Sequence, residues 1–149
     1  LGGWSLVAYN GSGGGQYKTV SLSGVITDQQ SGFGTLGFTF KDLQNGSPDG
    51  IALVDDAGQV VEFLSYEGSF TASDGPAAGL TATDVGVSED PDTPRRSSLQ
   101  RVGTGNQASD FTWQGPSSAS RGSVNSGQSF VAARVEIATR GGRVPGIDG

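Results

Sequence analysis

The stretch IALVDDAGQVVEFLSY, from Ile51 to Tyr66, carries the clearest structural signal in the sequence. Two apolar runs, Ile51–Val54 and Gln59–Tyr66, flank the polar segment DDAG at residues 55–58. Asp and Gly favour tight turns, because an Asp side chain bonds to nearby backbone amides and Gly adopts positive φ without strain. The pattern therefore predicts a β-hairpin, with the two acidic residues serving the turn rather than catalysis.

Short apolar alternations predict strands in the rest of the chain as well. No segment keeps a helical period of 3.6 residues, and residues 67–94 have the composition of a long ordered loop. The further expected strands are Trp4–Tyr9, Gln16–Leu22, Phe33–Phe40, Ser98–Val102, Asp110–Gln114 and Ser129–Thr139. About eight short strands separated by Gly- and Ser-rich turns are typical of an all-β sandwich.

The largest apolar side chains are expected to form the core of this sandwich. Phe33–Phe40 alternates cleanly, which places Leu36, Phe38 and Phe40 on one face. The residues expected to be mostly buried are Trp4, Leu6, Phe38, Phe40, Leu53, Phe63 and Trp113. Exposed aromatics would instead favour a carbohydrate-binding sandwich, which is a lesser alternative.

Composition removes most kinds of catalytic site. The chain of 149 residues, which fits one domain, contains no Cys and no His, so it has no thiol nucleophile, thiolate metal site or imidazole base. Glu89, Asp90 and Asp92 are weak calcium candidates, although they lack EF-hand spacing and also fit a solvated acidic loop. We expect no cofactor and no enzymatic activity. Because the chain also lacks Met, we expect a processed form or a piece of a longer protein.

Charge is distributed unevenly along the chain. Residues 1–119 hold 5 basic and 13 acidic side chains, whereas residues 120–149 carry a net charge of +2. An acidic body repels nucleic-acid phosphates, so we expect no nucleic-acid binding by this domain. No apolar run approaches the roughly 20 residues of a membrane-spanning helix, so we expect no membrane span.

Several segments in the same order resemble the bacterial lamin-tail domain. The segments are GWSLV at residues 3–7, DGIALVD at 49–55, VEFLSYEG at 61–68 and DFTW at 110–113, and the resemblance extends from Leu1 to about Phe130. It implies an immunoglobulin-like β-sandwich without catalysis of its own. It also implies a module of secreted or surface proteins, including extracellular nucleases and phosphoesterases.

One departure from that family concerns its first strand, which normally precedes the tryptophan strand. Here the segment that resembles it, RVEIA at residues 134–138, lies near the C-terminus, as in a circular permutation. We therefore expect a sandwich over residues 1–128 and a C-terminal strand and tail over 129–149. The tail would complete the sandwich in the same chain or in a neighbour. Its interaction strand alternates Val131, Ala133, Val135 and Ile137 with Glu136 facing outward, and we expect it beside Trp4–Tyr9.

These expectations lead to two main functional hypotheses. The first is a non-enzymatic structural or adhesive module, extracellular or at the cell surface, whose copies associate head-to-tail into a filament by C-terminal strand addition. The alternative is an accessory domain of a secreted nuclease or phosphoesterase. The position of the first strand favours the former, because an accessory domain would carry that strand N-terminally.

Overall fold

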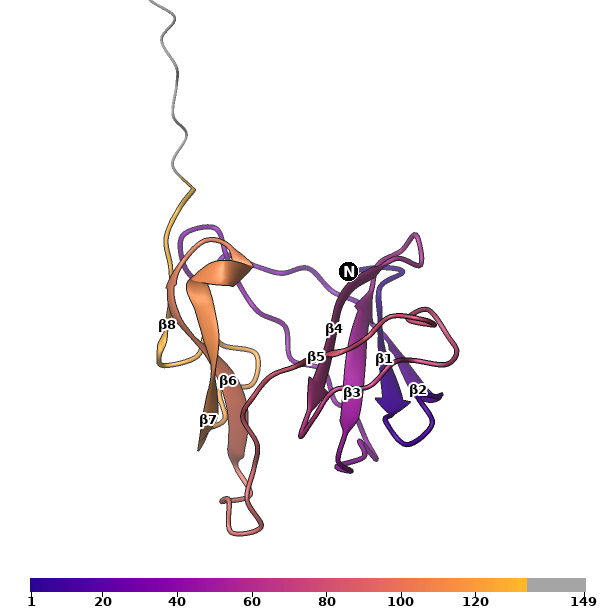
Figure 1. Cartoon of the computed structure of the whole chain (residues 1–149). Coiled ribbons are helices and arrows are strands. Elements are labelled where there is room, and N and C mark those ends of the chain that lie inside the picture. Colours follow the sequence, from indigo (N-terminus) through magenta and orange to yellow (C-terminus); the bar gives the residue numbers. More distant parts are fainter. Residues whose placement is uncertain (134–149) are drawn as a thin grey trace, which may run out of the picture.

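A computed structural model describes residues 1–133 of the chain and shows an all-β sandwich (Figure 1). These residues form eight strands and one turn of 3₁₀ helix, Ala108–Asp110, arranged in two sheets. The prediction of an all-β sandwich of about eight strands is confirmed. Among the described residues, no helix is long and apolar enough to cross a membrane.

The first sheet has five strands in the order β2-β1-β3-β4-β5. Their bounds are β1 Ser5–Asn10, β2 Gln16–Ser21, β3 Asp49–Val54, β4 Val60–Tyr66 and β5 Thr83–Asp84. The β1, β2, β3 and β4 strands pair antiparallel, while the two-residue β5 runs parallel to β4. Short turns join β1 to β2 and β3 to β4, whereas a long connection joins β2 to β3, which are not neighbours in the sheet.

The hairpin that joins β3 to β4 is the one predicted from the sequence. Asp55 Oδ1 accepts hydrogen bonds from the amides of Ala57, at 3.0 Å, and Gln59, at 2.7 Å. Gly58 has a φ of +77°, a conformation that glycine adopts without steric strain. Asp55 therefore serves the turn, as expected.

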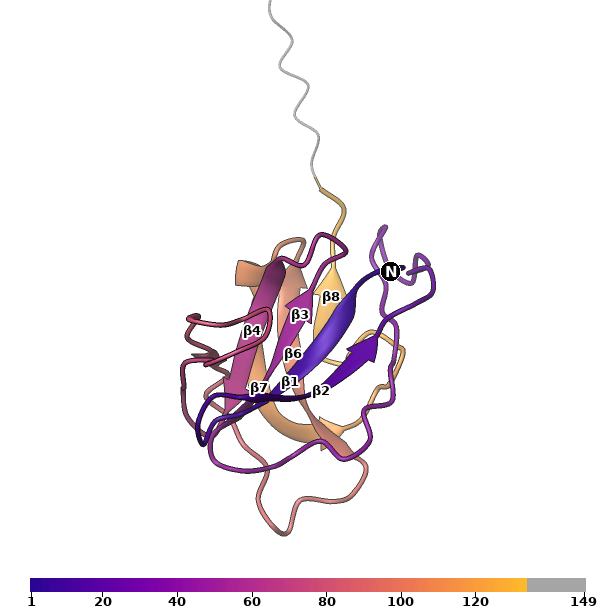
Figure 2. The same ribbon diagram turned by 90° about the vertical axis from the view of Figure 1, so that its right-hand side faces the viewer.

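The second sheet has three strands in the order β7-β6-β8 and lies behind the first sheet in Figure 2. Their bounds are β6 Ser97–Gly105, β7 Phe111–Ser118 and β8 Gln128–Phe130. The β6–β7 pair is antiparallel, and β8 runs parallel to the end of β6. Within the described residues, β7 has a partner on one side only.

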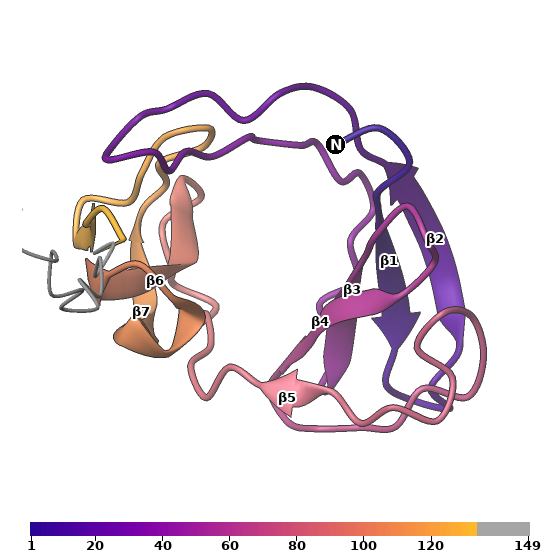
Figure 3. The ribbon, with the colours of Figure 1, turned by 90° about the horizontal axis from the view of Figure 1, so that it is seen from above.

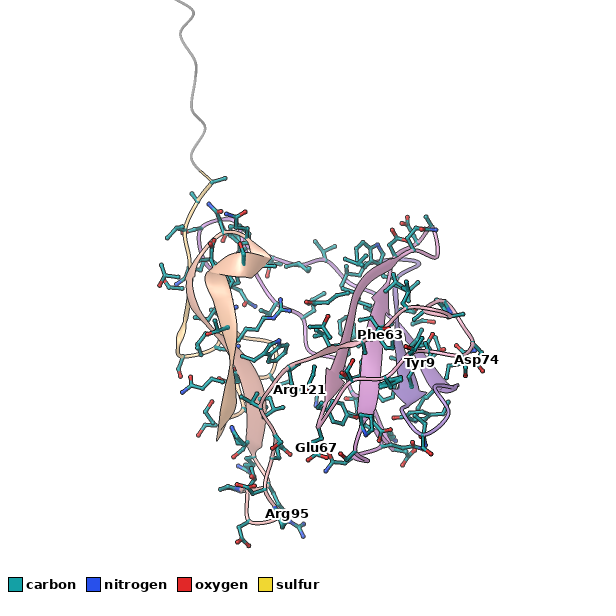
Figure 4. All side chains as sticks on the ribbon, viewed as in Figure 1. Tyr9, Phe63, Glu67, Asp74, Arg95 and Arg121 are labelled. Atoms are coloured by element: carbon teal, nitrogen blue, oxygen red, sulfur yellow. The ribbon has the colours of Figure 1, made fainter. Side chains whose placement is uncertain are left out.

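The best-buried apolar cluster lies on the outer face of the five-stranded sheet, away from the second sheet. Val7 and Tyr9 of β1, Ala52 and Val54 of β3, and Phe63 of β4 form its floor. A loop covers it with the small side chains Ala72, Ala77 and Ala82. The Phe63 ring lies 5.1 Å from that of Tyr9, and both are on the side of the loop that carries Asp74 (Figure 4).

This position of the core corrects part of the sequence prediction. Of the seven residues expected to be mostly buried, only Phe63 is buried, with 7% of its surface exposed. The other six, Trp4, Leu6, Phe38, Phe40, Leu53 and Trp113, are half-buried. The hydrophobic alternation did not show which face is covered: Leu6 and Leu53 share the face opposite to Phe63, and residues 70–82 fold back over the Phe63 face and bury it.

The predicted strand Phe33–Phe40 is wrong. Apart from an isolated bridge between Gln30 and Phe33, this segment has no strand pairing. It belongs to the long connection from β2 to β3, which crosses to the three-stranded sheet and returns (Figure 3). The Phe33 ring stacks on Phe130 of β8 at 4.8 Å. The alternation of residues 33–40 reflects an extended segment that packs one face against the protein but has no neighbouring strand to pair with.

The predicted strand Ser129–Thr139 is confirmed only at its start. β8 comprises Gln128–Phe130, and Val131, Ala132 and Ala133 are exposed and outside any strand. Residues 134–149 lie outside the described part of the chain. The Val131 N–H still donates to the carbonyl of Gly105 at 3.0 Å, so the chain remains attached to the end of β6 up to this point.

Candidate functional site

An apolar groove with a volume of about 670 Å³ lies between the two sheets. Protein interiors are normally close-packed, so the inner faces of the sheets do not fill the space between them. The apolar side chains that line the groove include Leu6, Ile51, Leu53, Leu64, Leu99 and Trp113.

The register of the first sheet explains why these side chains gather on one face. Leu6 is opposite Leu53, Leu53 is opposite Glu62, and Ile51 is opposite Leu64. Side chains of directly opposed residues share a face of the sheet. The sheet therefore carries apolar side chains on both faces, with the closed core outside and the open groove inside.

One charged contact spans the two sheets beside the groove. An Arg101 guanidinium on β6 forms an ion pair with Glu62 on β4, and its Cζ lies 5.0 Å from the centre of the Trp113 ring. The two charged side chains are 27% and 38% exposed, so solvent screens the pair and its contribution to stability is small. The same guanidinium therefore packs against the ring of Trp113, which lines the groove.

Two tyrosines bond to the backbone of Gln44, a residue that lines the groove. Tyr66, which lines the groove, donates to the Gln44 carbonyl at 2.5 Å, and the Gln44 N–H donates to the Tyr17 hydroxyl at 2.8 Å. Burial is the main cause that raises the pKa of both hydroxyls above the ordinary value, and the charge of nearby Asp49 adds to it. Both hydroxyls are therefore protonated at neutral pH, which leaves them unsuited to act as bases.

The most buried carboxylate of the described residues, Asp49, has a structural role. It is 2% exposed and accepts hydrogen bonds from the amides of Gly11, at 3.1 Å, and Gly46, at 2.5 Å. Its two bonds fix the loop that follows β1 and the loop that precedes β3, which meet at the same end of the sheet. A carboxylate satisfied by backbone amides on both oxygens is not available to a substrate.

The three weak calcium candidates do not form a cluster. Asp90 and Thr93 bond to each other in a local turn, with Asp90 N–H donating to Thr93 Oγ1 at 2.9 Å. Glu89 lines the groove, and all three acidic residues are exposed. Within residues 1–133, no group of three acidic side chains is placed to hold a metal ion.

The C-terminal interaction strand was expected beside β1, and that placement is wrong. β1 is paired along its whole length, with β2 on one side and β3 on the other, so no edge is free there. Of the strand residues, Val131 and Ala133 are described and exposed, whereas Val135, Glu136 and Ile137 lie outside the described residues.

No family model, curated protein or solved structure matches this chain.

Sequence reasoning missed the groove, although β4 carried a signal for it. Glu62, Leu64 and Tyr66 alternate with Phe63 and Ser65, so the strand offers large side chains to both faces. A strand covered on both sides has this pattern. It indicates that something covers the second face, but it cannot identify the covering segment.

Proposed function

We propose that this protein is a non-enzymatic structural or adhesive module, extracellular or at the cell surface, whose copies associate through their C-terminal segment. The observation that carries the proposal is the unfilled apolar groove between the sheets. Apolar surface left in water is unfavourable in proportion to its area, so a segment that covers the groove stabilises the fold. Covering by another copy would make association the function of the module.

The sequence supports a role without catalysis. With no His and no Cys, catalysis would have to rest on carboxylates, Lys, Tyr or Ser, and the buried Asp49 is already satisfied by backbone amides. The resemblance to lamin-tail domains supports the extracellular setting and the absence of an active site. The remaining candidate, an accessory domain of a secreted nuclease or phosphoesterase, agrees with the complete pairing of β1, because the first sheet then needs no added strand.

Oligomeric state separates these functions. We would compare the full chain with a chain that stops after Ala133, which keeps all eight described strands. Sedimentation and light scattering over a range of concentrations measure the mass of each. The proposal predicts that the full chain assembles and the shortened chain stays monomeric. A full chain that is monomeric at every concentration would contradict self-association and favour the accessory role.

A further inference from the structure

We propose, on the basis of the proposed function, that the inter-sheet groove accepts residues 134–139 of a second copy, added as a strand to the free edge of β7. Val135 and Ile137 would then lie on the groove side, and Arg134 and Glu136 would face solvent. Four observations carry this assignment: the lining of the groove, the edge of β7, the pattern of the segment and the length of the link that precedes it.

The groove lies under the β7 half of the three-stranded sheet. Leu99 of β6 and Trp113 of β7 line it, and so do Val85 and Glu89 of the connection that follows β5. No residue of β8 does. A strand that covers the groove must therefore enter on the β7 side.

β7 offers the long free edge at that position. It has eight residues and pairs only with β6 among the described residues, so one side of its backbone is left without a ladder. Unpaired strand edges accept a further strand through main-chain hydrogen bonds, and alternate side chains provide specificity. The half-buried residues Phe111 and Trp113 alternate with exposed Thr112 and Gln114. Every second side chain of an added strand would thus share the face of Trp113.

The segment RVEIAT at residues 134–139 has the pattern that this position requires. Val135 and Ile137 are β-branched and apolar, while Glu136 between them and Arg134 before them are charged. Such a strand suits a site with one apolar side and one side in water. The segment also brings Arg134, Arg140 and Arg143 toward a body that carries an excess of acidic side chains, which favours encounter between copies.

The length of the link favours a second copy as the source. The chain is attached to Gly105 up to Val131, at the β8 edge, which is opposite to the β7 edge. From Val131 to Arg134 the backbone spans at most roughly 11 Å at about 3.6 Å per residue. From β8 to a strand beyond β7 takes three strand spacings, roughly 14 Å at about 4.8 Å each. Arg134 therefore falls short of a strand position beyond β7 of its own chain, so the full length of residues 134–139 pairs there more readily when a second copy supplies it.

Disulfide trapping tests the proposal directly, because the chain contains no cysteine of its own. One population carries Ile137→Cys, and a second population carries one groove cysteine, either Leu64→Cys or Leu99→Cys. The matched controls are Val61→Cys, which lies on β4 but is 54% exposed and outside the groove, and Glu136→Cys, which lies on the opposite side of the segment. Circular dichroism verifies that each variant folds. The populations are mixed under conditions of assembly and oxidised, and cross-linked dimers are quantified.

The expected result is a cross-linked dimer between Ile137→Cys and a groove cysteine. No dimer should form when Val61→Cys replaces the groove cysteine or when Glu136→Cys replaces Ile137→Cys. If the unmodified chains assemble but no groove cysteine is trapped, the groove is not the acceptor, although self-association stands. If the unmodified chains do not assemble, self-association itself is wrong. A chain that carries both Ile137→Cys and Leu64→Cys and closes on itself as a monomer would overturn the second copy as the source.

Discussion

Two adjacent residues of β4 report separately on the closed core and on the open groove. Phe63 is 7% exposed, and its ring lies 5.1 Å from the Tyr9 ring and 5.5 Å from the Phe70 ring. Truncation of a buried aromatic to alanine costs about 3–5 kcal/mol, so Phe63→Ala should lower the free energy of unfolding by that amount. This loss is a large part of the roughly 5–15 kcal/mol that stabilises a typical domain.

Leu64→Ala is the matched comparison, because its side chain lines the groove and is only half-buried. The substitution removes three carbons at about 0.8 kcal/mol each when fully buried, so half-burial leaves a cost of about 1 kcal/mol. A leucine in a closed core would instead cost about 2–5 kcal/mol.

The measurement is urea denaturation followed by tryptophan fluorescence, in the chain that stops after Ala133. The free energy of unfolding comes from the midpoint and the slope of each transition. Equal losses for Leu64→Ala and Phe63→Ala would refute the reasoning, because the groove would then be packed like the core. In the full chain, the cost of Leu64→Ala should grow with protein concentration as association covers the groove.

Three other results are expected. The pKa of all three tyrosine hydroxyls is raised in the folded state, so the free energy of unfolding should stay constant up to the ordinary tyrosine pKa near 10 and fall at higher pH. Urea midpoints measured against pH test this expectation. A midpoint that stays constant above pH 10 would contradict it. Asp49→Ala leaves the Gly46 amide without its acceptor, while the Gly11 amide keeps the Pro48 carbonyl, and the substitution should cost about 1–3 kcal/mol in urea denaturation; the exposed Asp56→Ala should not change stability. Calcium should leave the melting temperature unchanged, and an increase that Asp90→Asn abolishes would show that the acidic loop binds the ion.

The strands with tight local turns could be predicted from the sequence, because their pairing depends on residues close by in the chain. The β3–β4 hairpin follows from two apolar runs and from an Asp and a Gly that fit the turn between them. The long connection from β2 to β3 could not be predicted in this way. Its Phe33–Phe40 alternation is the same whether a strand pairs with it or only packs against it.

The sequence alone determined that the chain is an all-β sandwich, because alternation with a period of two gives each strand an apolar face that another layer must cover. It also excluded thiol and imidazole chemistry, because the chain has no Cys and no His. Tertiary structure decided which layer covers which face. Residues 70–82 close over Phe63 on the outer face, while Leu64, the next residue of the same strand, lines an open groove. The physical reason is that burial depends on contacts between segments far apart in the chain, and no local pattern records which of those segments meet.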